Sequence, residues 1–136
     1  MTYLNREDII LINRKMTLQF GGSFSYHDNN IKNKEAFEYA IESVNANVFE
    51  IELYPNIFTK CALYMYCIIC NHIFHDGNKR TGLASSLLFL SKNGYGIKHE
   101  ISTEDIVKFT YAVGETKLNI EEIAYWFETN TYKKHF

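Results

Sequence analysis

Apolar residues recur along this chain at the three- and four-residue spacing that is typical of amphipathic helices. Gly21-Gly22 ends the first series, which consists of Ile9, Ile12, Met16 and Phe20. Asn5 and Asp8 have the spacing of a capping box at its start, with Asp in place of the usual Glu. Charged residues separate the members of a second series, which consists of Ala36, Phe37, Ala40, Ile41 and Val44. These patterns predict two helices before residue 45.

The middle of the chain predicts two further helices. Pro55 suits the first position of a third helix, and residues 61–70 are apolar on nearly every side, as in a helix that is buried all round. A fourth helix is expected to start at Asn78, as its N-cap, and to run to Asn93, with Gly94 as its C-terminal stop.

Two capping patterns predict the last helices. Ser102 with Asp105 begins a fifth, and Asn119 with Glu122 begins a sixth. Gly114 ends the fifth helix, whereas residues 95–98 are too few for a strand of consequence and residues 21–30 are expected to form a loop or hairpin. The sequence therefore predicts a single all-α domain over residues 1–136.

Composition narrows the class of protein. The chain has 136 residues, of which 46% are hydrophobic, so it can bury a sizeable core. A formal net charge of −2 argues against direct binding of nucleic acid. No signal-peptide pattern is present, and the apolar run at 61–70 is far shorter than the roughly 20 residues that span a membrane. Three cysteines on that run are expected to be reduced thiols, which predicts a cytoplasmic protein without a membrane segment.

The segment between the third and fourth predicted helices concentrates reactive side chains. An imidazole changes its protonation state near neutral pH, so His72 can act as a general base. Asp76 can hold a hydroxyl proton or a magnesium ion, and Gly77 allows the backbone to approach a ligand closely. Lys79 and Arg80 stand in a first turn, where the helix dipole favours acids, and a bound anion would resolve that conflict.

The segment from His72 to Arg80 resembles the signature H-x-F-x-(D/N)-(A/G)-N-K-R of the Fic/Doc family, specifically its death-on-curing (Doc) branch. Every defined position matches, namely His72, Phe74, Asp76, Gly77, Asn78, Lys79 and Arg80. The similarity extends to Gly21-Gly22 and to the apolar run at 87–94. The resemblance implies a compact bundle of about six helices, with the motif loop between two central ones, and a nucleotide-dependent transferase that modifies a protein hydroxyl.

Two positions bear on which group is transferred. Members of the Fic branch have Gly where this chain has Lys79 and Arg where it has Leu83, and typically transfer AMP. In the Doc branch the Lys is thought to occupy the space of a phosphate, so that ATP presents its γ-phosphate instead. The resemblance thus implies a protein kinase that uses ATP and Mg²⁺, modifies a threonine of translation elongation factor Tu and arrests translation.

The resemblance also implies a role for each position. His72 would take the proton of the target hydroxyl, and Asp76 would orient that hydroxyl or a magnesium ion. Asn78, Lys79 and Arg80, with the amides after Gly77, would hold the phosphates, while Phe74 would anchor the loop. A flap that docks the target is implied for the segment made of Gly22, Ser23, Phe24, Ser25, Tyr26, His27 and Asp28.

Two departures from the Doc pattern bear on the target. The flap reads Ser25-Tyr26-His27-Asp28 where Gly-(Ile/Met)-(Arg/Ser)-Asp is common, and Asn13 stands where many relatives have His. Three other interpretations stay open: AMP transfer at the same site, an inactive interaction module, and a structural metal module. The metal module would use the set Cys67, Cys70, His72 and His75.

Regulation is expected to come from another chain. The pattern (S/T)-x-x-x-E-(G/N) of the inhibitory helix that many Fic proteins carry does not occur in this sequence. The resemblance supplies a cognate antitoxin whose C-terminal segment folds onto the toxin. A solvent-exposed apolar groove is the structural feature that such a partner would need.

Overall fold

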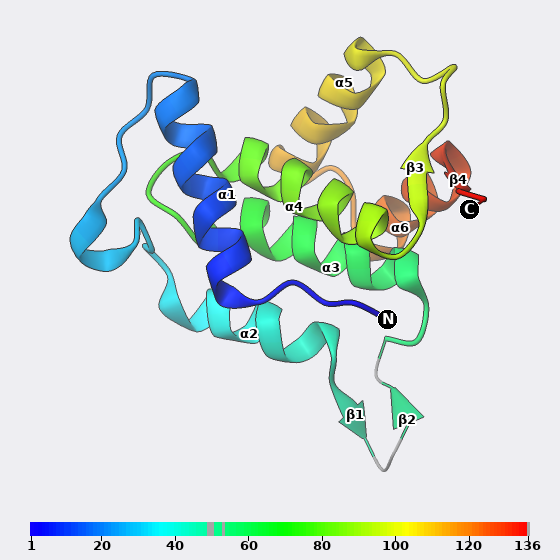
Figure 1. The fold of residues 1–136 in the computed structure, drawn as a ribbon, viewed down its shortest axis with the longest axis horizontal. Helices are drawn as coiled ribbons and strands as arrows, with labels where there is room; N and C mark the ends of the chain where they lie inside the picture. Colours follow the sequence, from blue (N-terminus) through cyan, green and yellow to red (C-terminus); the bar gives the residue numbers. More distant parts are fainter. Residues whose placement is uncertain (49–50, 53, 136) are drawn as a thin grey trace.

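The computed structural model describes residues 1–48, 51–52 and 54–135. Its helices surround a central helix, α3, and confirm the predicted all-α fold of about six helices (Figure 1). They are α1 (Arg6–Gln19), α2 (Lys34–Val44), α3 (Ile57–Cys70), α4 (Asn78–Lys92), α5 (Thr103–Gly114) and α6 (Ile120–Asn130).

The three predicted capping boxes are present. In α1 the Asp8 amide donates to Asn5 Oδ1 at 2.8 Å, and the Asn5 amide donates back to Asp8 Oδ2 at 2.9 Å. Ser102 with Asp105 and Asn119 with Glu122 make the same reciprocal pairs at the starts of α5 and α6. Each box satisfies amides that the helix leaves without an internal acceptor.

The start of α3 differs from the prediction. Pro55 was expected at the first helical position, but it lies outside the helix, which begins at Ile57. Asn56 is the N-cap, and its side-chain oxygen accepts a hydrogen bond from the Phe58 amide at 2.7 Å. The cap therefore moves the helix start two residues beyond the proline, because an asparagine can satisfy an amide that proline cannot.

Short strands accompany the helices. β1 (Asn47–Val48) pairs with β2 (Ile51–Glu52), and β3 (Tyr95–Ile97) pairs with β4 (Thr131–Lys133), both antiparallel. Residues 95–98 were predicted to be too short for a strand of consequence, and their three-residue strand forms only because the chain returns after α6. Residues 21–30 form a loop with a 3₁₀ turn, η1 (Tyr26–Asp28), and not a hairpin.

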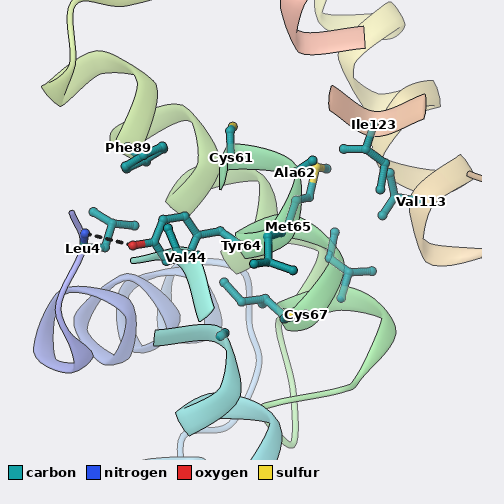
Figure 2. Packing of buried hydrophobic residues seen from close by; sticks show 14 of the residues in the cluster. Leu4, Val44, Cys61, Ala62, Tyr64, Met65, Cys67, Phe89, Val113 and Ile123 are labelled. Atoms are coloured by element: carbon teal, nitrogen blue, oxygen red, sulfur yellow. Dashed lines mark hydrogen bonds between the residues drawn. The ribbon is translucent and has the colours of Figure 1, made fainter. Parts of the chain in front are cut away.

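The core is built around α3, which packs against α2, α4 and α6. Tyr64 of α3 is fully buried, its hydroxyl accepts from the Leu4 amide at 3.2 Å, and its ring meets Phe89 edge-on (Figure 2). Gly82 of α4 lies so close to Ile69 that an added Cβ would stand 2.5 Å from that side chain. The prediction that α3 is buried on nearly every side is confirmed, and this tightly packed pair of helices presents the connecting loop at one end.

Among the described residues, none of the helices combines the length and the apolarity that crossing a membrane requires.

Candidate functional site

The candidate site is built on the loop that joins α3 to α4. His72 lies two residues beyond the end of α3 in a left-handed conformation, with φ of 47°, and its side chain is exposed. The Ile73 amide then donates back to the Ile68 carbonyl at 3.4 Å, which is the hydrogen bond of a Schellman-type helix end. His72 thus stands at the α3 end of the loop, on a sharp turn of the backbone.

Phe74 anchors this loop in the core. Its side chain is 1% exposed, and its ring packs edge-on against Phe37 of α2 with 5.8 Å between ring centroids. The Asn78 carboxamide holds both backbone groups of Phe74. Asn78 Oδ1 accepts from the Phe74 amide at 2.9 Å, and Asn78 Nδ2 donates to the Phe74 carbonyl at 2.8 Å.

The prediction that Asn78 caps α4 is therefore wrong. Asn78 is the first residue of the helix, and the N-cap is Gly77, which has a φ of 79° and no side chain with which to cap. The side chain of Asn78 is already committed to Phe74, so it cannot also accept from the amides of its own helix. The amides of the first turn consequently lack a side-chain partner at the cap, an arrangement that suits an anion.

Asp76 lies where the loop meets the flap. Its side chain is exposed, and Oδ1 accepts from the Gly77 amide at 2.9 Å. An added Cβ on Gly22 would stand 2.3 Å from Asp76 Oδ2, so the flap backbone closely approaches the carboxylate. The structure thus brings Asp76 together with one end of the flap and with the start of α4.

Lys79 and Arg80 point in different directions. The Lys79 ammonium lies 5.7 Å from the centre of the Tyr111 ring of α5, and its methylene groups run past Gly114. The Arg80 guanidinium lies 4.1 Å from the centre of the Phe20 ring at the end of α1. Both side chains are exposed. The two cations therefore flank the start of α4, each against an aromatic ring.

Main-chain hydrogen bonds join the loop to the segment that follows the flap and η1. The His75 amide donates to the Asn30 carbonyl at 2.9 Å, and the Lys32 amide donates to the Ile73 carbonyl at 2.7 Å. Within the flap, Phe24 is buried, while Gly22, Ser23, Tyr26 and His27 are exposed and Ser25 and Asp28 are partly exposed. Of these exposed positions, Gly22 lies beside Asp76 of the loop.

Asp28 adds a side-chain link between flap and loop. Its Oδ2 lies 3.0 Å from Nε2 of His75. Partial loss of hydration raises the pKa of the Asp28 carboxyl, but hydrogen bonds with His75, Ser25 and the Asn30 amide and the nearby His27 outweigh it, so the pKa is lowered. The charged form of Asp28 is thus the one that holds the flap to the loop.

Sequence reasoning missed the polar residues beneath the loop. Asn13 was noted only as a departure from the Doc pattern, yet it is fully buried and donates to the Asp76 carbonyl at 2.8 Å. Thr17, one turn further along α1, and Asn30, after the flap, are buried beside it. The signal was present, since Asn13 and Thr17 continue the inward face of α1 that Ile9 begins, and polar residues on such a face call for partners.

The cysteines and histidines proposed for a metal module do not converge. Cys67 is buried in the core, Cys70 donates to the Val113 carbonyl at 3.3 Å, and the His72 and His75 side chains are exposed. In the part of the chain that the structure describes, no three His, Cys, Asp or Glu side chains form a group that could hold a metal ion. The structural metal module is thereby contradicted.

Two adjoining hollows, of about 360 and 430 Å³, lie along α6 and away from the loop. Both are lined by Leu118, Trp126 and Asn130, and the first also by Phe109 of α5. Their lining mixes apolar and charged side chains, and it comes from α5, α6 and the turns that precede them.

Comparison with known proteins identifies the same family as the motif does. A sequence model described as the Fic/DOC family matches residues 3–90, which include the flap and the whole loop. A protein named Toxin Doc from Mycolicibacterium smegmatis is 26% identical over 122 residues, covering 90% of this chain and 88% of its own length. A protein named Protein kinase doc from Escherichia phage P1 is 27% identical over 124 residues, covering 91% of each. The chain belongs to the Fic/Doc family, and within that family its similarity is to the Doc branch.

Proposed function

We propose that this chain is the toxin of a toxin–antitoxin pair and acts as a protein kinase on a hydroxyl group of elongation factor Tu. The observation that carries the proposal is the loop itself, in which His72, Asp76 and the uncapped start of α4 stand on one rigidly anchored turn. The names of its two Doc relatives support both the toxin and the kinase assignments.

The residues present fit a nucleotide with its magnesium ion. Gly77 offers backbone without a side chain at a helix N-terminus, and phosphates bind well at such ends. The exposed Asp76 carboxylate suits Mg²⁺, which prefers one or two carboxylates together with phosphate oxygens. Bound ATP would supply an activated phosphoryl group and ADP as its leaving group.

Lys79 and Arg80 would complete the phosphate site. An exposed cation–π contact contributes only about 0.5–1 kcal/mol, whereas a charge-assisted hydrogen bond to a phosphate is among the stronger polar contacts in proteins. Turning away from the Tyr111 and Phe20 rings therefore costs these side chains little. They would neutralise charge as it shifts between the phosphates, which is the main catalytic requirement of phosphoryl transfer.

The proton of the target hydroxyl would pass to His72. As the hydroxyl oxygen forms its bond to the γ-phosphorus, the bond from that phosphorus to the oxygen of ADP breaks, and the imidazole takes the released proton. Asp76 would orient the hydroxyl or the metal, and the flap from Gly22 to Asp28 would hold the target backbone beside the loop.

The test is transfer of phosphate from γ-labelled ATP, with Mg²⁺, to purified elongation factor Tu, followed by mass spectrometry of the modified peptide. We expect a phosphorylated threonine with the unaltered protein, loss of the signal in His72→Ala, and retention in His99→Ala, which removes an exposed histidine outside the loop. An AMP group on the target would overturn the kinase assignment in favour of AMP transfer. Absence of any modification by the unaltered protein would overturn the proposed activity.

The partner would be a cognate antitoxin that acts in the cytoplasm with this chain. Co-expression with the gene that neighbours this one, followed by growth measurements, tests that part: we expect growth arrest from the toxin alone and recovery in the presence of the partner. Arrest that no neighbouring gene relieves would contradict it.

A further inference from the structure

A buried carboxamide of α1 lies directly beneath the candidate site. Asn13 Nδ2 donates to the Asp76 carbonyl at 2.8 Å and to Thr81 Oγ1 at 3.0 Å. Asn13 Oδ1 accepts from Asn30 Nδ2 at 2.9 Å. The Asn13 and Asn30 side chains are 0% and 1% exposed. One side chain thus joins α1, the segment after the flap, the motif loop and α4.

The Asn13 carboxamide satisfies all three neighbours at once. It offers two donors and an acceptor in one plane, whereas a carboxylate offers acceptors alone and an aliphatic side chain offers neither. Replacing Asn13 would leave the Asp76 carbonyl and the Asn30 side-chain amide with only the longer hydrogen bond between them, which Asn30 Nδ2 donates to the Asp76 carbonyl at 3.5 Å. Losing the two shorter hydrogen bonds is costly at such a junction, so the loop would shift to find new partners.

The contact acts on the peptide that carries the chemistry. Holding the Asp76 carbonyl fixes the plane of the peptide that links Asp76 to Gly77, and the amide of that same peptide donates to Asp76 Oδ1 at 2.9 Å. Asn13 Nδ2 also limits the space at Gly77, where an added Cβ would stand 3.2 Å from it. The direction of the Asp76 carboxylate and of the first amides of α4 therefore depends on Asn13.

We propose that Asn13 is a positioning residue of the candidate site, which it sets through the Asp76–Gly77 peptide while Asn30 and Thr81 hold its own orientation. It acts through other residues, since it is buried beneath the loop. The expected effect on kcat rests on the proposed function, whereas the orientation of the Asp76–Gly77 peptide can be measured without it.

Asn93, at the other end of α4, provides a matched control. Its Nδ2 donates to the Thr2 carbonyl at 2.9 Å and to the Phe89 carbonyl at 2.8 Å, and its Oδ1 accepts from the Thr2 amide at 2.8 Å. It therefore makes the same set of hydrogen bonds away from the loop, at a half-buried position, whereas Asn13 is fully buried. Asn13→Asp and Asn93→Asp remove the same donors.

The first experiment compares the kinetics of these two variants at temperatures where both are folded. We expect Asn13→Asp to lower kcat for phosphate transfer at saturating ATP by about 10–100-fold, because small displacements of reacting groups have effects of that size. The KM for ATP should change less than kcat, and Asn93→Asp should stay within about twofold of the unaltered protein in both. Equal effects of the two variants on kcat would overturn the proposal.

A milder pair covers the case in which Asn13→Asp does not fold. Thr81→Val removes one acceptor of Asn13 with little change of shape, and Thr81→Ser restores the hydroxyl. We expect kcat to fall several-fold in the valine variant and to recover in the serine variant. A valine variant with unchanged kcat would contradict the role assigned to the junction.

The second readout does not depend on activity. The amide NMR signals of Gly77 and Asn78 should shift in the Asn13→Asp or Thr81→Val protein and stay in place in Asn93→Asp. If the unaltered protein transfers no phosphate while these signals shift, the proposed function fails and the positioning role stands. If transfer occurs but the signals do not shift, the positioning role fails alone.

Discussion

Replacing Gly77 with alanine should destabilise the protein more than replacing Gly21, although both glycines have a φ of 79°. In the left-handed region a residue with a Cβ costs roughly 1–2 kcal/mol more than glycine, and this cost applies to both positions. At Gly21 an added Cβ meets nothing within 4 Å. At Gly77 it would stand 2.8 Å from Thr17 Cγ2 and 3.2 Å from Asn13 Nδ2.

The second cost is steric and falls on Gly77 alone. Thr17 and Asn13 are 2% and 0% exposed, so neither side chain can move outward to make room. Overpacking of such a site typically costs about 1–3 kcal/mol. We therefore expect a loss of roughly 1–2 kcal/mol for Gly21→Ala and about 2–5 kcal/mol for Gly77→Ala.

Urea denaturation followed by circular dichroism measures both free energies of unfolding under the same conditions. Thermal melts should agree, with a fall of about 4 °C per kcal/mol for a chain of this size. Equal losses in the two variants would refute the steric argument, and a loss below about 1 kcal/mol at Gly77 would refute the argument from backbone conformation as well.

Three further predictions concern the loop, the flap and the thiols. Phe74→Ala should lower the free energy of unfolding by about 3–5 kcal/mol in urea denaturation, because Phe74 is buried against the core. Folding lowers the pKa of Asp28, so the charged carboxylate stabilises the folded protein above the ordinary value of 3.8, and this stabilisation is lost as pH falls through the lowered value. The free energy of unfolding, measured against pH, should therefore fall less steeply in acid for Asp28→Asn than for the unaltered protein. Alkylation of the native protein should modify Cys70 first, because burial raises the pKa of Cys67 to about 12 and Cys61 is fully buried; a faster reaction at either buried thiol would contradict the packing.

Local patterns in the sequence were enough to predict most helices. The pairs Asn5 with Asp8, Ser102 with Asp105 and Asn119 with Glu122 act within one turn, so their spacing alone indicates where a helix begins. The uniformly apolar segment at 61–70 likewise predicted a helix buried on all sides, since its composition leaves no polar face for water.

The site was only partly predictable, because sequence patterns report on residues that are close together in the chain. The residues from His72 to Arg80 were identified from one continuous string, because their types and spacing are local. Whether Asn78 caps α4 could not be decided from spacing, since its carboxamide had two possible partners, the amides of its own helix and the Phe74 backbone four residues earlier. The burial of Phe74 against Phe37 shapes the loop so that the second contact forms, and that contact leaves Gly77 as the cap.

Tertiary structure alone decided what surrounds the loop. Asn13 meets Asp76 across 63 positions of sequence and Asn30 across 17, and Asp28 meets His75 across 47. No spacing rule connects residues so far apart, because their meeting depends on how α1 and the flap pack against α3 and α4. The sequence by itself determined the helices and the reactive string; the packing of the helices determined the hydrogen bonds that give the string its shape.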